Sequence, residues 1–166
     1  MSNFREIFEQ AKLELQVFEK NKELICKKVL PIIFIAQIND FKIDSIKLRG
    51  KNSNDNFSKD LKKFEENHKL KFIIAKSSNK IPLSVNNITN SINLISLISY
   101  NGLLKYQSLL KRLRNAFFHN NFNIKNNFIY LKDINIKNKN KPTMLGKMKL
   151  NAFEELIDIL SKYIRN

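Results

Sequence analysis

One segment carries most of the structural information in this chain: LLKYQSLLKRLRNAFFHNNFNIKNNFIY, residues 103–130. Its first half, up to Phe118, repeats apolar residues at the three- and four-residue spacing of a helix with one buried face. Its second half alternates apolar and polar residues on both sides of Asn126-Asn127, which is typical of a β-hairpin with a tight turn. We therefore expect a long helix that ends near His119 and is followed by a short hairpin.

The remainder of the chain has mainly helical patterns. Apolar stripes at helical spacing run through five further segments: 3–26, 32–41, 58–75, 88–98 and 151–164. Gly, Asn and Ser predict loops at 48–56 and 77–84, and the basic segment 134–143 is expected to be a loop or an edge. The sequence thus predicts an all-α fold, an up-and-down bundle of about four to six helices with a short β-hairpin before the C-terminal helix.

The chain of 166 residues has the length and composition of one domain, residues 1–166, with no internal repeat and no linker. Its longest apolar stretch, Val29 to Ile38, is about half of the ~20 residues that a membrane span needs, and Pro31 and Gln37 interrupt it. The N-terminal residues contain no apolar signal core. We therefore expect a cytoplasmic protein that does not enter a membrane.

The net charge of +15 is concentrated in one region. Residues 101–150 contain eleven basic side chains and a single acid, Asp133. Compositional drift would spread the lysines evenly, whereas a local positive field attracts a polyanion, most simply a nucleic acid. The alternative is a lysine-rich loop that is merely solvated. The candidate RNA-binding residues in this region are Lys111, Arg112, Lys137, Lys139 and Lys141.

The same region contains an unusual group of side chains in KRLRNAFFHNNF, residues 111–122. Two of the chain's five arginines, Arg112 and Arg114, lie within three residues, and one of its two histidines is His119. On a helix, Arg112, Asn115 and His119 share one face, with Arg114 on the neighbouring flank. The pattern predicts that these polar side chains converge on a surface that the core does not use.

These residue types suit RNA cleavage. Histidine can take or give a proton near neutral pH, arginine forks onto phosphate oxygens, and asparagine can hold a hydroxyl or orient an imidazole. These residue types are present here as His119, Asn115 and the neighbouring arginines Arg112 and Arg114. The sequence has no carboxylate cluster or Cys/His set for a catalytic metal, so we expect a metal-free route without a cofactor. The alternative is that these are surface residues of an ordinary amphipathic helix.

The segment LRNAFFHNNF, residues 113–122, resembles the helix-terminal motif of the HEPN superfamily, in which an arginine, four to six residues and a histidine end a helix. The polar Asn115 after the arginine fits that motif. The expected hairpin and closing helix that follow fit its context. The resemblance departs at Asn120, where many relatives have glycine. It also departs at Asn121, where some toxins carry a tyrosine that their antitoxin modifies.

The resemblance implies a helical bundle that forms a homodimer and brings two motifs into a shared cleft. Catalytic members are metal-independent endoribonucleases, and carry-over makes Arg114, Asn115 and His119 the active site. The leading hypothesis is an enzyme that cleaves RNA through a 2′,3′-cyclic phosphate and acts as a toxin or an antiviral or stress effector, with an antitoxin or regulatory protein as a further partner. The alternatives are a noncatalytic module that binds nucleic acid or regulates, and a structural subunit that pairs with another chain.

Overall fold

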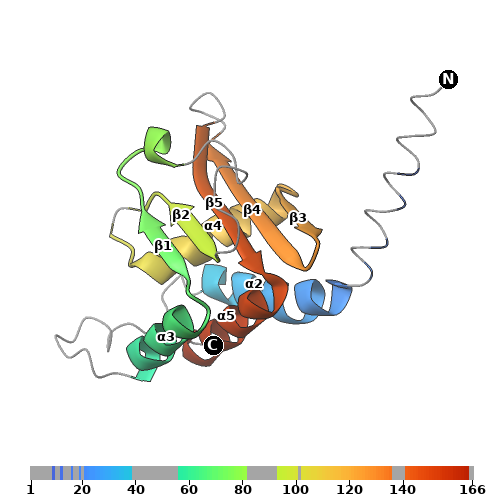
Figure 1. Ribbon diagram of the computed structural model, residues 1–166, viewed down its shortest axis with the longest axis horizontal. Helices are drawn as coiled ribbons and strands as arrows, with labels where there is room; N and C mark the ends of the chain where they lie inside the picture. Colours follow the sequence, from blue (N-terminus) through green and yellow to red (C-terminus); the bar gives the residue numbers. More distant parts are fainter. Residues whose placement is uncertain are drawn as a thin grey trace.

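The computed structural model describes residues 9, 12, 16, 19, 21–38, 56–81, 93–100, 102–135 and 141–164. They form a mixed five-stranded sheet with helices packed on one side of it (Figure 1). The helical elements are η1 (Glu23–Val29, a π-helix), α2 (Leu30–Ile38), α3 (Asn56–Asn67), η2 (Ser78–Lys80, a 3-10 turn), α4 (Lys105–Phe118) and α5 (Leu150–Tyr163). The strands are β1 (Lys71–Ile74), β2 (Leu94–Leu97), β3 (Phe122–Lys125), β4 (Phe128–Asn135) and β5 (Lys141–Lys149).

The prediction of an all-α helical bundle is wrong, because a sheet in the order β1-β2-β5-β4-β3 forms the centre of the fold. The β1–β2 pair is parallel and the other three pairs are antiparallel. The predicted hairpin is present as β3 and β4, but it is only one edge of this larger sheet. The three strands that the sequence analysis did not predict are β1, β2 and β5.

Strand β1 lies in the segment where the sequence predicted a helix over residues 58–75. Helix α3 instead ends at Asn67, and Lys69 adopts a left-handed conformation with a φ of 49°. The Leu70 N–H donates to the Glu65 carbonyl at 2.9 Å and closes the helix end. The chain then extends from Lys71 and pairs with β2, so the apolar residues that looked like a continued helical stripe belong to a strand.

Strand β2 replaces the helix expected over residues 88–98, of which 88–92 lie outside the described residues. All four of its residues are buried. Ile95 and Leu97 belong to the main core, while Ser96 points to the opposite face of the sheet. A strand covered on both faces is apolar throughout, and its periodicity cannot be told from that of a buried helix.

Strand β5 begins within the segment expected to be a loop or an edge, yet it lies between β2 and β4 in the sheet. Its sequence has low strand propensity, because it contains three lysines, Pro142 and Gly146. A Cβ at Gly146 would lie 3.4 Å from the Cβ and Cδ1 of Leu131 on β4, at the close end of ordinary van der Waals contact. The pairings with β2 and β4 therefore place this strand in the sheet despite its low strand propensity.

Three local predictions are confirmed by the structure. Helix α4 ends at Phe118, and the next strands turn at Asn126 and Asn127, whose φ values of 51° and 62° suit a primed hairpin turn. The closing helix is present as α5. Of the helix predicted over residues 3–26, only part is described, and it includes the π-helical η1 just before Pro31, whose missing N–H disturbs the preceding turn.

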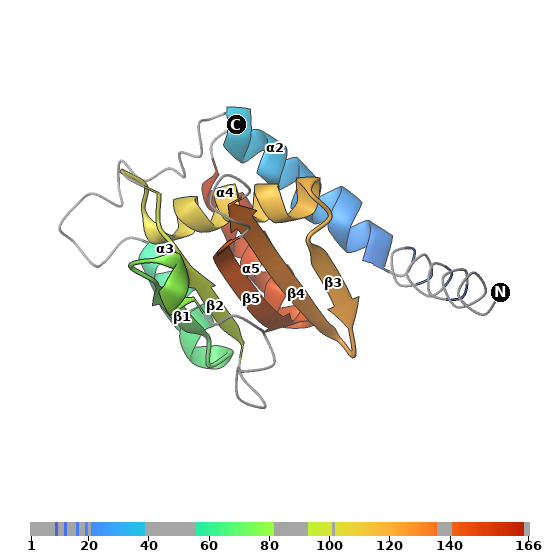
Figure 2. The ribbon, with the colours of Figure 1, turned by 90° about the horizontal axis from the view of Figure 1, so that it is seen from above.

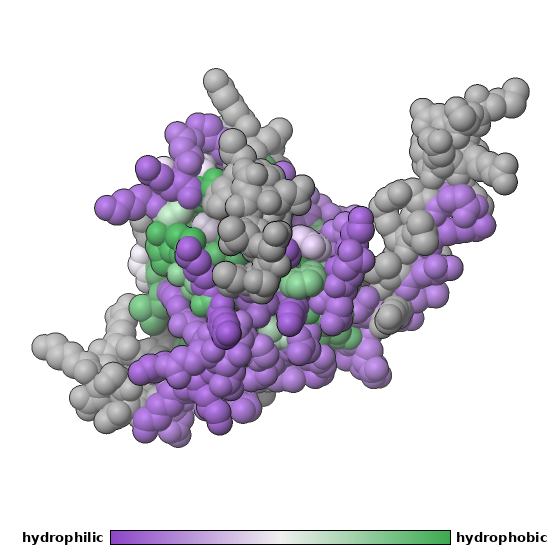
Figure 3. Space-filling model, in the orientation of Figure 1, coloured by the Kyte–Doolittle hydropathy of each residue, from purple (hydrophilic) through white to green (hydrophobic). Residues whose placement is uncertain are grey.

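The helices cover one face of the sheet, with α4 lying between the strands and α2 (Figure 2). The main core fills this side, and its largest fully buried side chains include Phe64, Phe153 and Leu113. A smaller cluster of Ala75, Ile81 and Leu145 covers part of the opposite face beside η2. In Figure 3 the surface over α3 and α5 is hydrophilic, whereas hydrophobic side chains gather over β1 and β2.

Among the described helices, none is both long enough and apolar enough to cross a lipid bilayer.

The buried side chain of Asn93, directly before β2, links the turn between α3 and β1 to the junction between β5 and α5. Its Nδ2 donates to the His68 carbonyl at 2.8 Å, in the turn between α3 and β1. Its Oδ1 accepts from the Lys149 N–H at 2.7 Å, where β5 passes into α5. Asn93 is 5% exposed, so water cannot replace either bond at low cost.

We predict that Asn93→Ala lowers the free energy of unfolding by about 1–3 kcal/mol, because it removes two part-buried hydrogen bonds and leaves the Lys149 N–H and the His68 carbonyl without this partner. Urea unfolding followed by circular dichroism measures the change. Asn123→Ala, at an exposed position of β3, is the matched control and should change stability by less than about 0.5 kcal/mol. Equal stability of the two variants would contradict the role given to Asn93.

Candidate functional site

Helix α4 ends in a fixed geometry that presents His119 at the surface. Asn120 is left-handed, with a φ of 51°. The Asn120 N–H donates to the Phe117 carbonyl at 3.2 Å, and the Asn121 N–H donates to the Ala116 carbonyl at 2.7 Å. This pair of bonds is a Schellman cap, in which asparagine can take the place of glycine. His119 is the exposed cap residue, and none of the described residues hydrogen bonds to its imidazole.

Arg114 and Asn115 contact each other one turn before that cap. Arg114 Nη1 donates to Asn115 Oδ1 at 3.1 Å, and the guanidinium lies over the Phe118 ring at 5.4 Å from its centroid. The Arg114 Nε is enclosed and has no hydrogen-bond partner among the described residues. The guanidinium is thus held in place, and the described residues leave most of its donors unused, a state suited to binding an oxyanion.

Arg112 lies in the interior and not on the polar surface that the helical spacing predicted. Only 8% of it is exposed, and its Nη1 donates to Asp133 Oδ2 at 2.8 Å. The same atom donates to the Tyr100 hydroxyl at 3.2 Å, while Nε and Nη2 donate to the Ile98 carbonyl at 3.3 and 3.0 Å. Its guanidinium also stacks on the Tyr100 ring at 4.0 Å. Binding RNA would require Arg112 to give up these contacts.

Asp133 is a residue of the candidate site that the sequence analysis did not select. Its Oδ2 accepts from Thr143 Oγ1 at 2.8 Å and from Asn115 Nδ2 at 3.4 Å, in addition to Arg112. Asp133 is therefore the acceptor that holds Asn115 in position. The one sequence signal for it was its isolation, as a single acid among eleven bases between residues 101 and 150.

A cavity of about 770 Å³ opens beside this network. It lies where β2 and β4 end and β5 begins, and α4 forms one wall. Its polar lining includes Ser78, Tyr100, Asn115, Asn135 and Thr143. Cavities of this size commonly hold small molecules or parts of larger ligands, with a few polar groups fixing the orientation.

The candidate lysines are placed differently from one another. Lys111 Nζ lies over the Tyr100 ring, 4.4 Å from its centroid, and so stands near this cavity. Lys141 Nζ donates to Asn79 Oδ1 at 3.5 Å, one residue from the cavity residue Ser78. Lys137 and Lys139 lie outside the described residues. The structure thus brings Lys111 and Lys141 to the cavity region.

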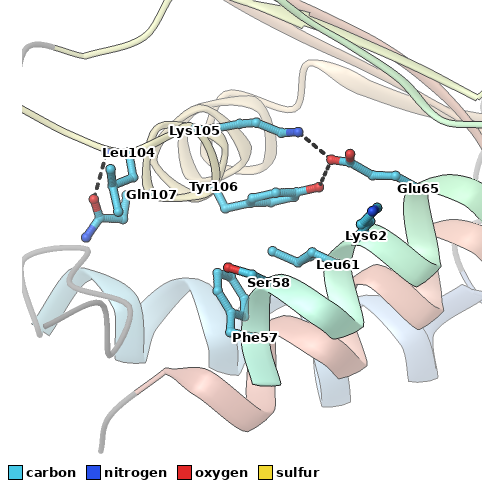
Figure 4. Close-up of a pocket in the computed structure, with 9 residues that line it drawn as sticks. All are labelled: Phe57, Ser58, Leu61, Lys62, Glu65, Leu104, Lys105, Tyr106 and Gln107. Atoms are coloured by element: carbon cyan, nitrogen blue, oxygen red, sulfur yellow. Dashed lines mark hydrogen bonds and ion pairs between the residues drawn. The ribbon is translucent and has the colours of Figure 1, made fainter. Parts of the chain in front are cut away.

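A second cavity, of about 310 Å³, lies between α3 and the start of α4 (Figure 4). Glu65 points from α3 toward α4 and accepts hydrogen bonds from Lys105 and from the Tyr106 hydroxyl. Burial raises the pKa of Tyr106 far above its usual value, and the Glu65 carboxylate raises that pKa further. Because Glu65 is paired within the protein, we interpret this cluster as a link between two helices.

Among the described residues, no group of three His, Cys, Asp or Glu side chains could hold a metal ion.

The raised pKa of Tyr106 predicts a loss of stability at high pH. A phenol in the unfolded chain ionises near pH 10, while the folded protein keeps its Tyr106 proton. Stability from this group is therefore present below pH 10 and lost as the pH rises further, by up to about 1.4 kcal/mol per pH unit. Urea unfolding between pH 8 and pH 11 should show a steeper loss for the wild type than for Tyr106→Phe. Parallel pH profiles would contradict this interpretation.

Comparison with known proteins leaves the site to be interpreted from its own geometry. No family model matches the chain, and comparison with curated proteins and with solved structures found no match.

Proposed function

We propose that this protein is a metal-independent endoribonuclease whose active site contains Arg114, Asn115 and His119. The observation that carries the proposal is the end of α4, where an Arg114–Asn115 pair lies one turn before an exposed histidine. The cap at Asn120 fixes that histidine's backbone, and the buried network behind Asn115 fixes the amide. Phosphodiester cleavage depends on positioned groups of these types, and here the Arg114 and Asn115 side chains and the His119 backbone are held in place.

In the proposed reaction, the ribose 2′-oxygen attacks the adjacent phosphorus. The bond from phosphorus to the 5′-oxygen breaks, leaving a 2′,3′-cyclic phosphate and a 5′-hydroxyl. The 2′-hydroxyl must lose a proton and the leaving 5′-oxygen must gain one, and His119 is the group that moves them. Arg114 stabilises the negative charge on the phosphorane, and Asn115 orients the ribose or the phosphate through its amide.

The proposal includes a homodimer, because one chain contributes one such histidine to a reaction with two proton transfers. Phe34 on α2 and Phe118 on α4 support this arrangement. They are 49% and 50% exposed, and their ring centroids lie 5.5 Å apart in an edge-to-face contact. This exposed pair adjoins Arg114, so a second copy packed on it would bring two His119 residues toward one groove.

The HEPN resemblance supports the proposal through the motif alone, since the sheet does not belong to the helical bundle that the resemblance implied. Within that resemblance, we propose a toxin or an antiviral or stress effector that an antitoxin or other protein partner controls. A noncatalytic RNA-binding module is the second candidate. The engagement of Asn115 with Tyr100 and Asp133 favours it, because an amide used inside the protein has fewer groups left for substrate.

We predict that His119→Ala reduces cleavage of single-stranded RNA by about 10² to 10⁴, the usual contribution of a positioned proton-transfer group. The fold should survive, because the side chain is exposed. Arg114→Lys should also impair cleavage, since a lysine cannot form the bidentate fork. The wild type should release 2′,3′-cyclic phosphate ends, leave DNA uncut and remain active with a chelator. Gel analysis of labelled oligonucleotides measures all of these.

The matched control is His68→Ala, because His68 is the chain's other histidine and pairs with Glu155 on α5. This variant should cleave RNA like the wild type. Full activity in the His119→Ala protein, or activity abolished by chelator, would defeat the mechanism and favour the RNA-binding module.

The dimer gives a separate prediction. Phe118→Glu places a charge in the exposed aromatic pair and should convert the protein from dimer to monomer, measured by light scattering after size-exclusion chromatography. Leu104→Glu is the matched control, because Leu104 is 41% exposed at the opposite end of α4. A monomeric wild type at micromolar concentration, or a dimer that persists in Phe118→Glu, would exclude this interface.

A further inference from the structure

The hydroxyl of Tyr100 lines the larger cavity with its hydrogen-bonding capacity only partly used. It accepts hydrogen bonds from Arg112 Nη1 at 3.2 Å and from Asn115 Nδ2 at 3.3 Å. A phenol has two lone pairs to accept with and one hydrogen to donate. Both bonds use the lone pairs, so the hydroxyl hydrogen has no acceptor among the described residues.

The direction of these two bonds follows from the chemistry of the partners. Arg112 has no acceptor atom and can only donate. The Asn115 amide must turn its oxygen toward the Arg114 guanidinium and its nitrogen toward the Asp133 carboxylate. It therefore offers an N–H to Tyr100. The Tyr100 hydroxyl cannot donate to either neighbour, and its hydrogen is left for an atom in the cavity.

The surroundings of Tyr100 favour an oxygen that carries negative charge. The guanidinium of Arg112 lies 4.0 Å from the ring centroid, and Lys111 Nζ lies 4.4 Å from it. A hydroxyl that accepts from a cation is polarised and becomes a stronger donor. Asp133 is the one carboxylate among the described residues that line the cavity, and it is already paired with Arg112, so it repels an anion less than a free carboxylate would.

We propose that this cavity is a subsite for the RNA nucleotide next to the one that is cut, and that the Tyr100 hydroxyl donates to a phosphate oxygen of that nucleotide. This inference rests on the proposed ribonuclease function. Asn115 connects the two sites, because its oxygen faces Arg114 in the motif and its nitrogen faces Tyr100 in the cavity. The volume of about 770 Å³ is enough for a nucleotide, and Lys141 adds positive charge near Ser78.

The test measures binding of a short single-stranded RNA to full-length His119→Ala protein, which should bind without cutting. Adding Tyr100→Phe should raise the Kd about tenfold, the effect of losing one hydrogen bond to a charged acceptor. The fold should persist, because Arg112 and Asn115 both retain Asp133 as an acceptor. Tyr130→Phe, in β4, is the matched control and should leave the Kd unchanged.

A second variant leaves the hydrogen-bond network intact. Ser78→Trp, at a half-buried position of the cavity wall, should fill the cavity and weaken RNA binding by at least as much. If circular dichroism shows that Tyr100→Phe does not fold, Ser78→Trp tests the proposed subsite by itself. Weaker binding in the folded variants supports the subsite, whereas an unchanged Kd in Tyr100→Phe, or in Ser78→Trp, overturns it.

The two proposals fail in different ways. Cleavage that depends on His119, together with RNA binding that ignores Tyr100, removes the subsite and keeps the ribonuclease. Binding that depends on Tyr100 in a wild-type protein that cuts no RNA keeps the cavity as an RNA-binding site and removes the ribonuclease. RNA that does not bind at all overturns the subsite.

Discussion

The ion pair between Arg112 and Asp133 is the constraint around which this fold and its candidate site are arranged. Both side chains are nearly inaccessible to water, at 9% and 3% exposure, so each charge must be matched inside the protein. The pair joins α4 to β4 and thereby fixes the rotation of α4 against the sheet. That rotation determines which α4 residues face the core and which face solvent. Removing one partner would leave an unmatched buried charge, at a cost of about 3–5 kcal/mol.

What could be predicted from the sequence was local. Helix α4, the turn at Asn126-Asn127 and helix α5 each depend on residues close in the chain, and their patterns were sufficient. The sheet depends on pairings between distant segments, and its strands lacked a strand pattern. β2 is buried on both faces, and β5 contains Pro142 and Gly146, which are rare in the interior of a strand. Periodicity describes one face of one element, so it could not find them.

The same difference between local and distant contacts applies to the candidate site. Arg114, Asn115 and His119 were identified because they lie within a single turn and its cap. Helical spacing also placed Arg112 with the polar face, but its partner Asp133 is 21 residues away on a strand. Tyr100 reaches the network from the segment after β2 and Thr143 from β5, and no spacing rule connects them. An arginine that looked available for RNA is therefore structural, and the residues that position Asn115 became visible only in three dimensions.

The mixed order of the sheet has a consequence for how the chain folds. α4, β3, β4 and β5 follow one another closely and can form early, because the loops that they close are short. β2 pairs with β5 across about fifty residues, so its docking must overcome a much larger loss of chain entropy. Tyr100 lies shortly after β2 and depends on that late docking, while Asn115 belongs to α4, which is among the elements that can form early. The larger cavity is therefore complete only after the slow long-range pairing, and a partly folded chain would display Arg114, Asn115 and His119 without it.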